Sequence, residues 1–161
     1  NTTHTVKIEV LSTKNASAKG IGIAIDAIQV LNTPPALTTG IHQENSLTYN
    51  GYWLTNSDNN HNGGNIKYST TANSSVEFSF TGTGFKWISM TNPYRGHARV
   101  TIDGVVQPIV DSYSASTIYK NVVFEKDGLQ NTTHTVKIEV LSTKNASAKG
   151  IGIAIDAMQI N

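Results

Sequence analysis

One glycine- and asparagine-rich stretch, "YNGYWLTNSDNNHNGGN", gathers aromatic and polar side chains within a few residues. Tyr52 and Trp53 offer flat rings, on which the C–H faces of sugars stack. Asp58 and His61 offer hydrogen-bonding groups that suit sugar hydroxyls, as do the asparagines between them. The composition predicts that most of this stretch is loop. The residue types leave Trp53 with two equal interpretations, a ring packed at the edge of the core and a platform for a ligand.

A second loop, "TNPYRG", adds the ring of Tyr94 and the guanidinium of Arg95. We interpret Arg95 as a hydrogen-bonding clamp on neighbouring loops in preference to a ligand contact. Tyr113 and Tyr119, in "DSYSASTIYK", fit a ligand-contacting role or a packing role equally well. Trp87 lies within the alternating segment "GFKWISM", so we expect it in the core.

Nothing in the sequence has the spacing of a catalytic centre. The motifs G-x-S-x-G and H-E-x-x-H and the phosphate-binding P-loop are absent. His42, His61 and His97 do not have the spacing of metal ligands. The run Asn56–Asn62 offers oxygen ligands for a hard cation, but it lacks the ordered D-x-D-x-D-G pattern, so we expect a solvated loop. The sequence therefore predicts a protein for binding or structure rather than an enzyme, with no certain cofactor.

The composition excludes several classes of partner. The formal net charge is +1, which gives no electrostatic reason to expect nucleic acid or an anionic membrane. The chain has no run of about 18 consecutive apolar residues, so no membrane span is expected. Cysteine is absent, which excludes a disulfide framework. Charged residues make up only 14% while Thr, Ser, Asn and Gly are abundant, a balance that favours an extracellular all-β protein.

Period-2 alternation of apolar and polar residues recurs along the chain and indicates β-strands rather than helices. "HTVKIEV" and "SVEFSF" each place apolar side chains on one face and polar side chains on the other. "HARVTIDG" ends in Asp103-Gly104, a strong hairpin signal, and "VVQPIV" supplies the returning strand, with Pro108 at an edge or a strand end. "GFKWISM" and "YKNVVFEKDGL" predict further strands. About eight or nine short strands predict an antiparallel β-sandwich or jelly roll.

The segment "IGIAIDAMQI" changes its parity. Ile151, Ile153 and Ile155 share one face, whereas Met158 and Ile160 have the other parity. A β-bulge at the central "DA" would return both halves to the core. We expect the aspartate at this bend to accept backbone hydrogen bonds or to coordinate a cation.

The two ends of the chain carry nearly the same sequence. Asn1–Leu31, the front copy, and Asn131–Asn161, the rear copy, align at an offset of 130 residues. They differ at Ile28/Met158, Val30/Ile160 and Leu31/Asn161. A repeat of this length has the size of a domain, so the parent protein is expected to string such modules together. We divide the chain into the C-terminal strand pair of a preceding repeat (1–31), a proline-containing linker (32–40) and a complete module (41–161).

Several motifs stand in the same order as in a known family. "LTYNGYW", "GTGFKWISM", "NPYRGHARVTIDG", "DSYSASTIYKNVVFEKDGL", "THTVKIEV" and "IDAMQI" are spread over residues 40–160. With these motifs the chain resembles a repeated galactose-binding-like jelly-roll module of secreted Gram-positive bacterial proteins, a group that includes many carbohydrate-binding modules. The resemblance implies a sandwich of about eight strands, with ligand met by loops at one end or by a concave face. It also implies secretion, with the bacterial cell surface as the expected location.

The resemblance bears on individual residues. Related modules often hold a structural Ca²⁺ between an early acidic residue and an acid on the last strand, which implies Glu44 and Asp156 as its ligands here. The early stretch "HQENSLTYNG" departs from the commoner doubly acidic version. Tyr94 stands where the family usually has a small or polar residue, so we interpret it as a platform particular to this copy. Arg95 matches the arginine of the family's own motif.

Two functions compete at this stage. The first is a non-catalytic carbohydrate-binding or adhesion module, in which tandem weak sites gain avidity for a glycan or cell-surface polysaccharide. The second is a structural repeat of a surface stalk or filament, whose partners are neighbouring copies of the same module. Loop aromatic side chains that stay exposed would favour sugar binding, and fully packed ones would favour the stalk.

The front copy has a physical consequence of its own. A two-stranded piece is marginal in water, and the module already uses the same sequence in its rear copy. Two nearly interchangeable segments therefore compete for one place in the sandwich. The front copy fills this place in its own chain as a circular permutant, or it completes a neighbouring molecule by strand addition or swapping. We predict the second arrangement, a head-to-tail association by strand complementation.

Overall fold

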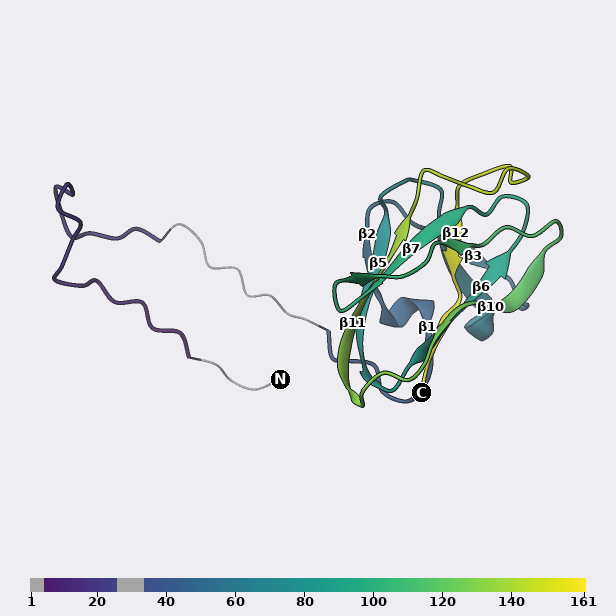
Figure 1. Cartoon of the computed structure of the whole chain (residues 1–161), viewed down its shortest axis with the longest axis horizontal. Coiled ribbons are helices and arrows are strands. Elements are labelled where there is room, and N and C mark those ends of the chain that lie inside the picture. The colour runs from purple at the N-terminus through teal and green to yellow at the C-terminus, as the bar shows by residue number, and fades with distance from the viewer. Residues whose placement is uncertain (1–4, 26–33) are drawn as a thin grey trace. The chain divides into compact units, whose positions relative to one another are not determined.

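The computed structural model describes residues 5–25 and 34–161, and the chain divides into two compact units, Asn1–Pro35 and Ala36–Asn161 (Figure 1). The described part of the second unit contains thirteen strands and two short 3-10 helices. The strands are β1 (Gly40–Gln43), β2 (Thr48–Asn50), β3 (Leu54–Ser57), β4 (Asn65–Ser69), β5 (Ser75–Gly82), β6 (Phe85–Thr91), β7 (His97–Ile102), β8 (Val105–Val106), β9 (Val110–Asp111), β10 (Ile118–Lys126), β11 (Thr132–Val140), β12 (Ile153–Ile155) and β13 (Ala157–Ile160). The helices are η1 (Glu44–Ser46) and η2 (Asn62–Gly64).

The strands form three antiparallel sheets. The first sheet has the order β2-β5-β11-β7-β8, and β9 also pairs with β7. The second sheet has the order β1-β13-β6-β10, and the third, smaller sheet has the order β12-β4-β3. The predicted all-β antiparallel sandwich is confirmed. Its strands are more numerous than predicted because several of them are only two to four residues long.

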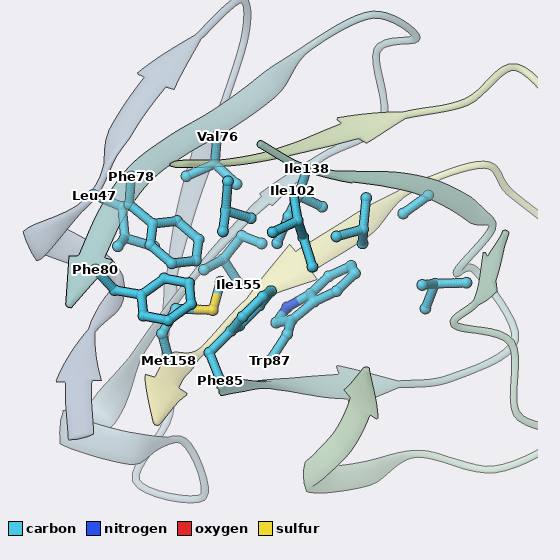
Figure 2. Packing of buried hydrophobic residues seen from close by; sticks show 14 of the residues in the cluster. Leu47, Val76, Phe78, Phe80, Phe85, Trp87, Ile102, Ile138, Ile155 and Met158 are labelled. Carbon is cyan, nitrogen blue, oxygen red and sulfur yellow. The ribbon is translucent and has the colours of Figure 1, made fainter. Parts of the chain in front are cut away.

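The core lies between the inward-facing side chains of the first two sheets, and Ile153 and Ile155 of β12 in the third sheet add to it (Figure 2). β11 is the central strand of the first sheet, and its Val136, Ile138 and Val140 are all buried, as the alternation of "HTVKIEV" predicts. On the facing sheet, Trp87 of β6 is 0% exposed and donates its Nε1–H to the carbonyl oxygen of Ala154 at 3.1 Å. The predicted core position of Trp87 is therefore confirmed.

The predicted hairpin at Asp103-Gly104 is also confirmed. The two residues have φ of 49° and 78° and join β7 to β8 in a two-residue turn, which requires positive φ at both positions. Pro108 lies between the short strands β8 and β9, where no ladder hydrogen bond needs its missing N–H.

The parity change in "IGIAIDAMQI" occurs at Asp156. The chain leaves β12, which pairs with β4, and enters β13, which pairs with β6 and β1. The break is thus a change of sheet rather than a β-bulge within one ladder. It buries every residue of 153–158, because the two halves face the core from different sheets.

Residues 5–25 of the front copy carry strand sequences, but no strand is assigned to them. In a turn at this segment, the backbone oxygen of Asn15 accepts the Ala18 N–H at 2.9 Å. The alternating apolar side chains are exposed: Val6 by 81%, Ile8 by 53%, Val10 by 53%, Ile23 by 53% and Ile25 by 55%. The expected strand pair is therefore not formed within 5–25, and the remaining residues of its span, 1–4 and 26–31, lie outside the described residues.

Hydrogen bonds to the sandwich begin inside the segment expected as linker (32–40). Leu37 donates its N–H to Ser79 O at 2.7 Å and accepts the Thr81 N–H at 2.8 Å, and these two residues belong to β5. β1 then starts at Gly40. Residues 32 and 33 of the expected linker lie outside the described residues.

Candidate functional site

The turn Asp58–Gly64 joins β3 to β4 and buries one side chain. The Asp58 N–H donates to Gly64 O and the His61 N–H donates to Asp58 O, both at 2.9 Å. Asp58 Oδ1 accepts the Asn60 N–H at 2.9 Å, and this bond holds the pKa of the Asp58 carboxyl below its usual range. The φ of Gly64 is 81°, in the left-handed region that favours glycine. The turn directs His61 inward, so that only 2% of the residue is exposed.

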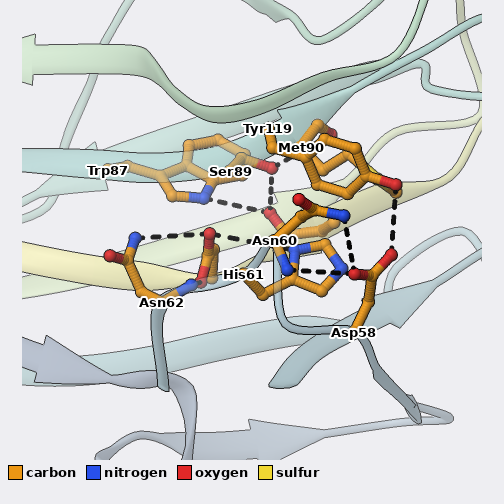
Figure 3. A network of polar contacts seen from close by, with 10 residues as sticks. Asp58, Asn60, His61, Asn62, Trp87, Ser89, Met90 and Tyr119 are labelled. Atoms are coloured by element: carbon orange, nitrogen blue, oxygen red, sulfur yellow. Dashed lines mark hydrogen bonds and ion pairs between the residues drawn. The ribbon is translucent and has the colours of Figure 1, made fainter. Parts of the chain in front are cut away.

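His61 packs against Tyr119 of β10, with ring centroids 5.2 Å apart (Figure 3). The Tyr119 hydroxyl donates to Asp58 Oδ2 at 3.2 Å. Burial lowers the pKa of His61 and outweighs the charge of Asp58, which raises it, so the imidazole is neutral at pH 7. Neither ring nitrogen of His61 has a hydrogen-bond partner within the part of the chain that the structure describes. A polar group supplied from outside the chain would be stabilised here.

Arg95 is a buried cation in the loop between β6 and β7. It is 6% exposed, and its guanidinium carbon lies 5.5 Å from the ring centroid of Tyr68. Burial lowers the pKa of Arg95 to about 10, which keeps it charged at neutral pH. Among the described residues, no carboxylate lies within ion-pair distance of it, and its Nε has no partner. The loop is instead clamped by its backbone, because the Gly96 N–H donates to Gly152 O at 2.7 Å.

Tyr94 precedes Arg95 in the same loop, and its ring is exposed. Tyr94 is 60% exposed, and Lys149 Nζ lies 5.8 Å from its ring centroid. Tyr113 is half-buried, and its backbone bridges to Asn92 at the start of the loop. Three segments that are separate in sequence therefore meet at this loop.

Tyr52 and Trp53 precede β3, whereas Asp58 follows it, so these residues lie at opposite ends of one strand. The ring of Trp53 packs edge-on against Tyr49, with centroids 5.0 Å apart, and its Nε1–H donates to Asn50 O at 3.0 Å. Trp53 is therefore partly buried and packs at the edge of the core. Tyr52 is 61% exposed. The predicted site residues are thus divided between the two ends of β3.

The sequence contains no signal for Tyr68, because it stands within a regular strand, and it leaves the role of Tyr119 open. Both rings contact the buried polar residues of the candidate site. Strand pairing across the module brings Tyr68 to Arg95 and Tyr119 to His61. These contacts cannot be predicted from spacing along the chain.

The predicted calcium ligands Glu44 and Asp156 are buried, with 5% and 0% exposure. Asp156 Oδ1 accepts the Asn62 N–H at 2.8 Å, while burial and, to a smaller extent, nearby Glu44 raise the pKa of Asp156 to about 6. Gln43 Oε1 is buried and has no partner among the described residues. Two carboxylates and an amide oxygen are the ligand types that Ca²⁺ prefers, so these residues fit the ion. In the described ranges, no group of three or more His, Cys, Asp or Glu side chains is arranged to hold a metal.

Two proteins of Flavonifractor plautii are similar to this chain in sequence. One, named A type blood N-acetyl-alpha-D-galactosamine deacetylase, is 30% identical over 131 residues, which are 79% of this chain and 17% of that protein. The other, named A type blood alpha-D-galactosamine galactosaminidase, is 31% identical over 107 residues, which are 66% of this chain and 10% of that protein. No protein-family model matches the chain.

Among solved structures, part of a Paenibacillus xanthan lyase has the same fold, with a TM-score of 0.59 and 16% identity over 81% of this chain and 14% of the lyase. The chain spans less than a fifth of the length of each of these three proteins. It is therefore an all-β sandwich that is similar to a short segment of carbohydrate-active enzymes. No helix within the described residues has the length and apolar character needed to cross a bilayer.

Proposed function

We propose that this chain is a non-catalytic carbohydrate-binding module of a secreted or cell-surface protein. The observation that carries the proposal is the contact of the exposed Tyr119 ring with buried His61, together with buried Arg95, which follows exposed Tyr94 in one loop. Arg95 Nε and both ring nitrogens of His61 have no hydrogen-bond partner in the described chain. Rings stack on the apolar face of a sugar, and such nitrogens bond its hydroxyl or carbonyl oxygens. Asp58 orients Tyr119 through its hydrogen bond. The similarity to short segments of carbohydrate-active enzymes supports this function.

The names of the two relatives suggest the first ligand class to test. Both names refer to a galactosamine of A type blood. We therefore propose a glycan that ends in N-acetylgalactosamine or galactosamine. An acetamido group presents a carbonyl acceptor that suits a guanidinium and a methyl group that suits a tyrosine ring. A single site of millimolar affinity is worth only about 4 kcal/mol, so linked copies of the module would gain avidity.

The test is a calorimetric or NMR titration of the chain with N-acetylgalactosamine and with galactosamine, and with glucose as a comparison sugar. We expect saturable binding of one or both amino sugars. Tyr94→Ala is expected to weaken binding by about tenfold, equivalent to about 1.4 kcal/mol of lost stacking, with an unchanged melting temperature because the ring is 60% exposed. Tyr52→Ala is the matched control, since Tyr52 is 61% exposed and stands before β3, outside the turn with Asp58 and His61 and outside the loop with Tyr94 and Arg95. Equal effects of the two substitutions would contradict the proposed site.

We further propose that Glu44 and Asp156 hold a structural Ca²⁺, with the amide oxygen of Gln43 as a third ligand. The ion would supply a positive charge beside the buried carboxyl of Asp156, whose pKa burial raises to about 6, and would favour its ionised form. Its role is to stabilise the end of the sandwich where β12 passes into β13.

A second candidate function is the structural repeat of a stalk or filament, assembled by strand complementation between copies. The exposed apolar side chains of the front copy, such as Ile8 with 53% exposure, favour it. Light scattering over a concentration series tests this function. Growth in mass with concentration would support the stalk, and a constant monomer mass would contradict it.

A further inference from the structure

Identical sequence occupies two different environments in this chain. Residues 5–25 and 135–155 are identical position by position. Ile138 is 0% exposed in β11, whereas its counterpart Ile8 is 53% exposed. Val140 is likewise 0% exposed, and its counterpart Val10 is 53% exposed. Within this range, the front copy therefore has the same side chains, at matching positions, as those that the rear copy buries in the core.

The rear copy fills one place in the sandwich, which we call the slot. β11 pairs with β5 on one side and with β7 on the other. β12 pairs with β4, and β13 pairs with β1 and β6. All of these partner strands come from residues 40–102, so the slot is lined by the rest of the module. A segment of the same sequence would make the same hydrogen bonds and contacts there.

The end of the slot lies beside the start of the module. β13, the last strand in the slot, pairs with β1, the first strand of the module. Asn161 O accepts the Thr83 N–H at 2.8 Å, and Leu37 O accepts the Thr81 N–H, also at 2.8 Å. Thr81 and Thr83 are two residues apart, which corresponds to about 7 Å along an extended chain. Leu37 therefore lies close to Asn161, the last residue of the slot.

The chain between the two copies is long enough to close this gap. With the front copy in the slot, Leu31 would stand at the position of Asn161, and residues 32–36 would lead to Leu37. An extended segment of that length reaches about 17 Å, well beyond the gap. The connection therefore allows the front copy to enter the slot of its own module without disturbing the strands that line it.

We propose that the front copy and the rear copy exchange for the slot within a single chain. The same sandwich then exists in two arrangements, one with the rear copy in the slot and the front copy in solvent, and one with the reverse. Because β11 is the central strand of its sheet, exchange requires the sandwich to open, so it proceeds at the rate of unfolding. This inference is independent of the carbohydrate-binding function.

The positions that differ between the copies favour the rear copy. Val30 lacks one methyl group of its counterpart Ile160, which is 1% exposed, and so leaves a small void. Asn161 Nδ2 donates to Asp127 Oδ1 at 2.8 Å, a bond that the leucine of the front copy cannot make. The front copy has Ile28 where the rear copy has Met158, and this difference conserves volume and changes the preference for the rear copy little. We expect the rear arrangement to predominate by a factor of about 10 to 100.

The test disables the rear copy and asks whether the front copy replaces it. Ile138→Asp places a carboxylate at a fully buried position of the rear copy. In the full chain we expect this variant to keep a cooperative unfolding transition and a monomer mass. The matched control is Ile8→Asp, which changes the same position of the exposed front copy and is expected to leave the transition unchanged. The two substitutions together are expected to abolish the transition.

Thiol labelling identifies the copy that occupies the slot. The chain contains no cysteine, so Val10→Cys or Val140→Cys, introduced singly, reports on one copy. With no other change, we expect the cysteine at 140 to be protected and the cysteine at 10 to react freely. In the Ile138→Asp background we expect the order to reverse.

The labelling result decides the inference whether or not the buried aspartate is tolerated. Protection of Val10→Cys in a monomeric Ile138→Asp chain supports exchange within one chain. If Val10→Cys stays reactive in that background, the front copy has not entered the slot and the inference is wrong. Protection that appears only in dimers or larger assemblies means that the exchange runs between chains, and it overturns the single-chain arrangement as well.

Discussion

At the residue scale, His134 and Asp103 link the start of β11 to the turn between β7 and β8. His134 Nδ1 lies 2.6 Å from Asp103 Oδ2, and Asp103 Oδ1 accepts the Thr135 N–H at 2.8 Å. The hydrogen bond with Asp103 raises the pKa of His134. The same bond lowers the pKa of Asp103. The pair is therefore most stabilising when both groups are ionised.

We predict that the stabilisation by the His134–Asp103 pair is largest at weakly acidic pH and decreases at both lower and higher pH. The contribution of His134 is fully present below its unfolded pKa of about 6.5 and is lost as the pH rises through the raised folded pKa. The contribution of Asp103 is present above its unfolded pKa of about 3.9 and is lost as the pH falls through the lowered folded pKa. We expect Asp103→Asn to remove the decline above about pH 6.5, as measured by urea unfolding over a pH series. A decline of the same size in the variant would refute this role of the pair.

Asp156 is expected to lower the stability of the cation-free chain at neutral pH. Because its pKa is raised to about 6, the stability of the neutral form is lost as the pH rises from about 4 through 6. If Ca²⁺ binds as proposed, about 1 mM Ca²⁺ will raise the melting temperature at pH 7 relative to EDTA. Asp156→Asn is expected to remove this response and to stabilise the EDTA-treated chain by about 1–3 kcal/mol. Equal melting temperatures of the unsubstituted chain with Ca²⁺ and with EDTA would contradict the ion site.

Single buried residues could be predicted only where strand alternation decides their environment. Trp87 follows from its place in an alternating strand. The burial of His61 does not follow from its neighbours, because it depends on the turn after β3 and on Tyr119, a residue of the distant strand β10. Trp53 stayed undecided for the same reason, since its role depends on where the ring of Tyr49 lies.

At the element scale, the alternation predicts strands but does not predict the sheets to which they belong. The parity change at Asp156 marks the boundary between β12 and β13 correctly. That the two strands belong to different sheets could not be predicted, because their partners β4, β6 and β1 are far away in sequence. The Asp-Gly turn was predictable in full, because positive φ at both residues is a local property.

In the loop that carries Tyr94, Gly96 allows the backbone of Ile151 in the rear copy to approach closely. A Cβ on Gly96 would lie 2.6 Å from the Cα of Ile151, so Gly96→Ala is expected to cost about 1–3 kcal/mol and to weaken glycan binding. Gly104→Ala is the control. At that position nothing lies within 4 Å and φ is 78°, so we expect a cost of about 1 kcal/mol without an effect on binding. Calorimetry and urea unfolding of both variants measure the difference, and identical results would argue against the close contact.

At the whole-molecule scale, the described chain consists of one sandwich and, at residues 5–25, an exposed segment with the same sequence as residues 135–155 of that sandwich. The repeat is evident from the sequence. The sequence does not show which copy forms strands, because residues 5–25 and 135–155 are identical. The pairing of Leu37 with the sandwich was also not predictable, since its hydrogen bonds are made with β5, about forty residues further along the chain.

Hydrogen exchange offers a test of this organisation. The peptides 5–11 and 135–141 have the same sequence and hence the same mass. We expect their shared mass spectrum to split during exchange into a fast and a slow envelope of equal intensity, because only one copy is protected by strand pairing. In Ile8→Asp the fast envelope should move to a new mass and the slow one should stay. A single envelope in the unsubstituted chain would mean that both copies have the same protection.

Because Val6, Ile8 and Val10 are exposed in the native chain, the binding of an antibody can report the fraction of folded molecules. An antibody raised against the linear epitope "TVKIEV" would reach residues 5–10 in the native chain, while the identical epitope at 135–140 stays closed within the sheet. Native chains would therefore bind one antibody fragment each, and denatured chains would bind two. The binding ratio would report the fraction of unfolded molecules directly, with no dye and no change to the sequence.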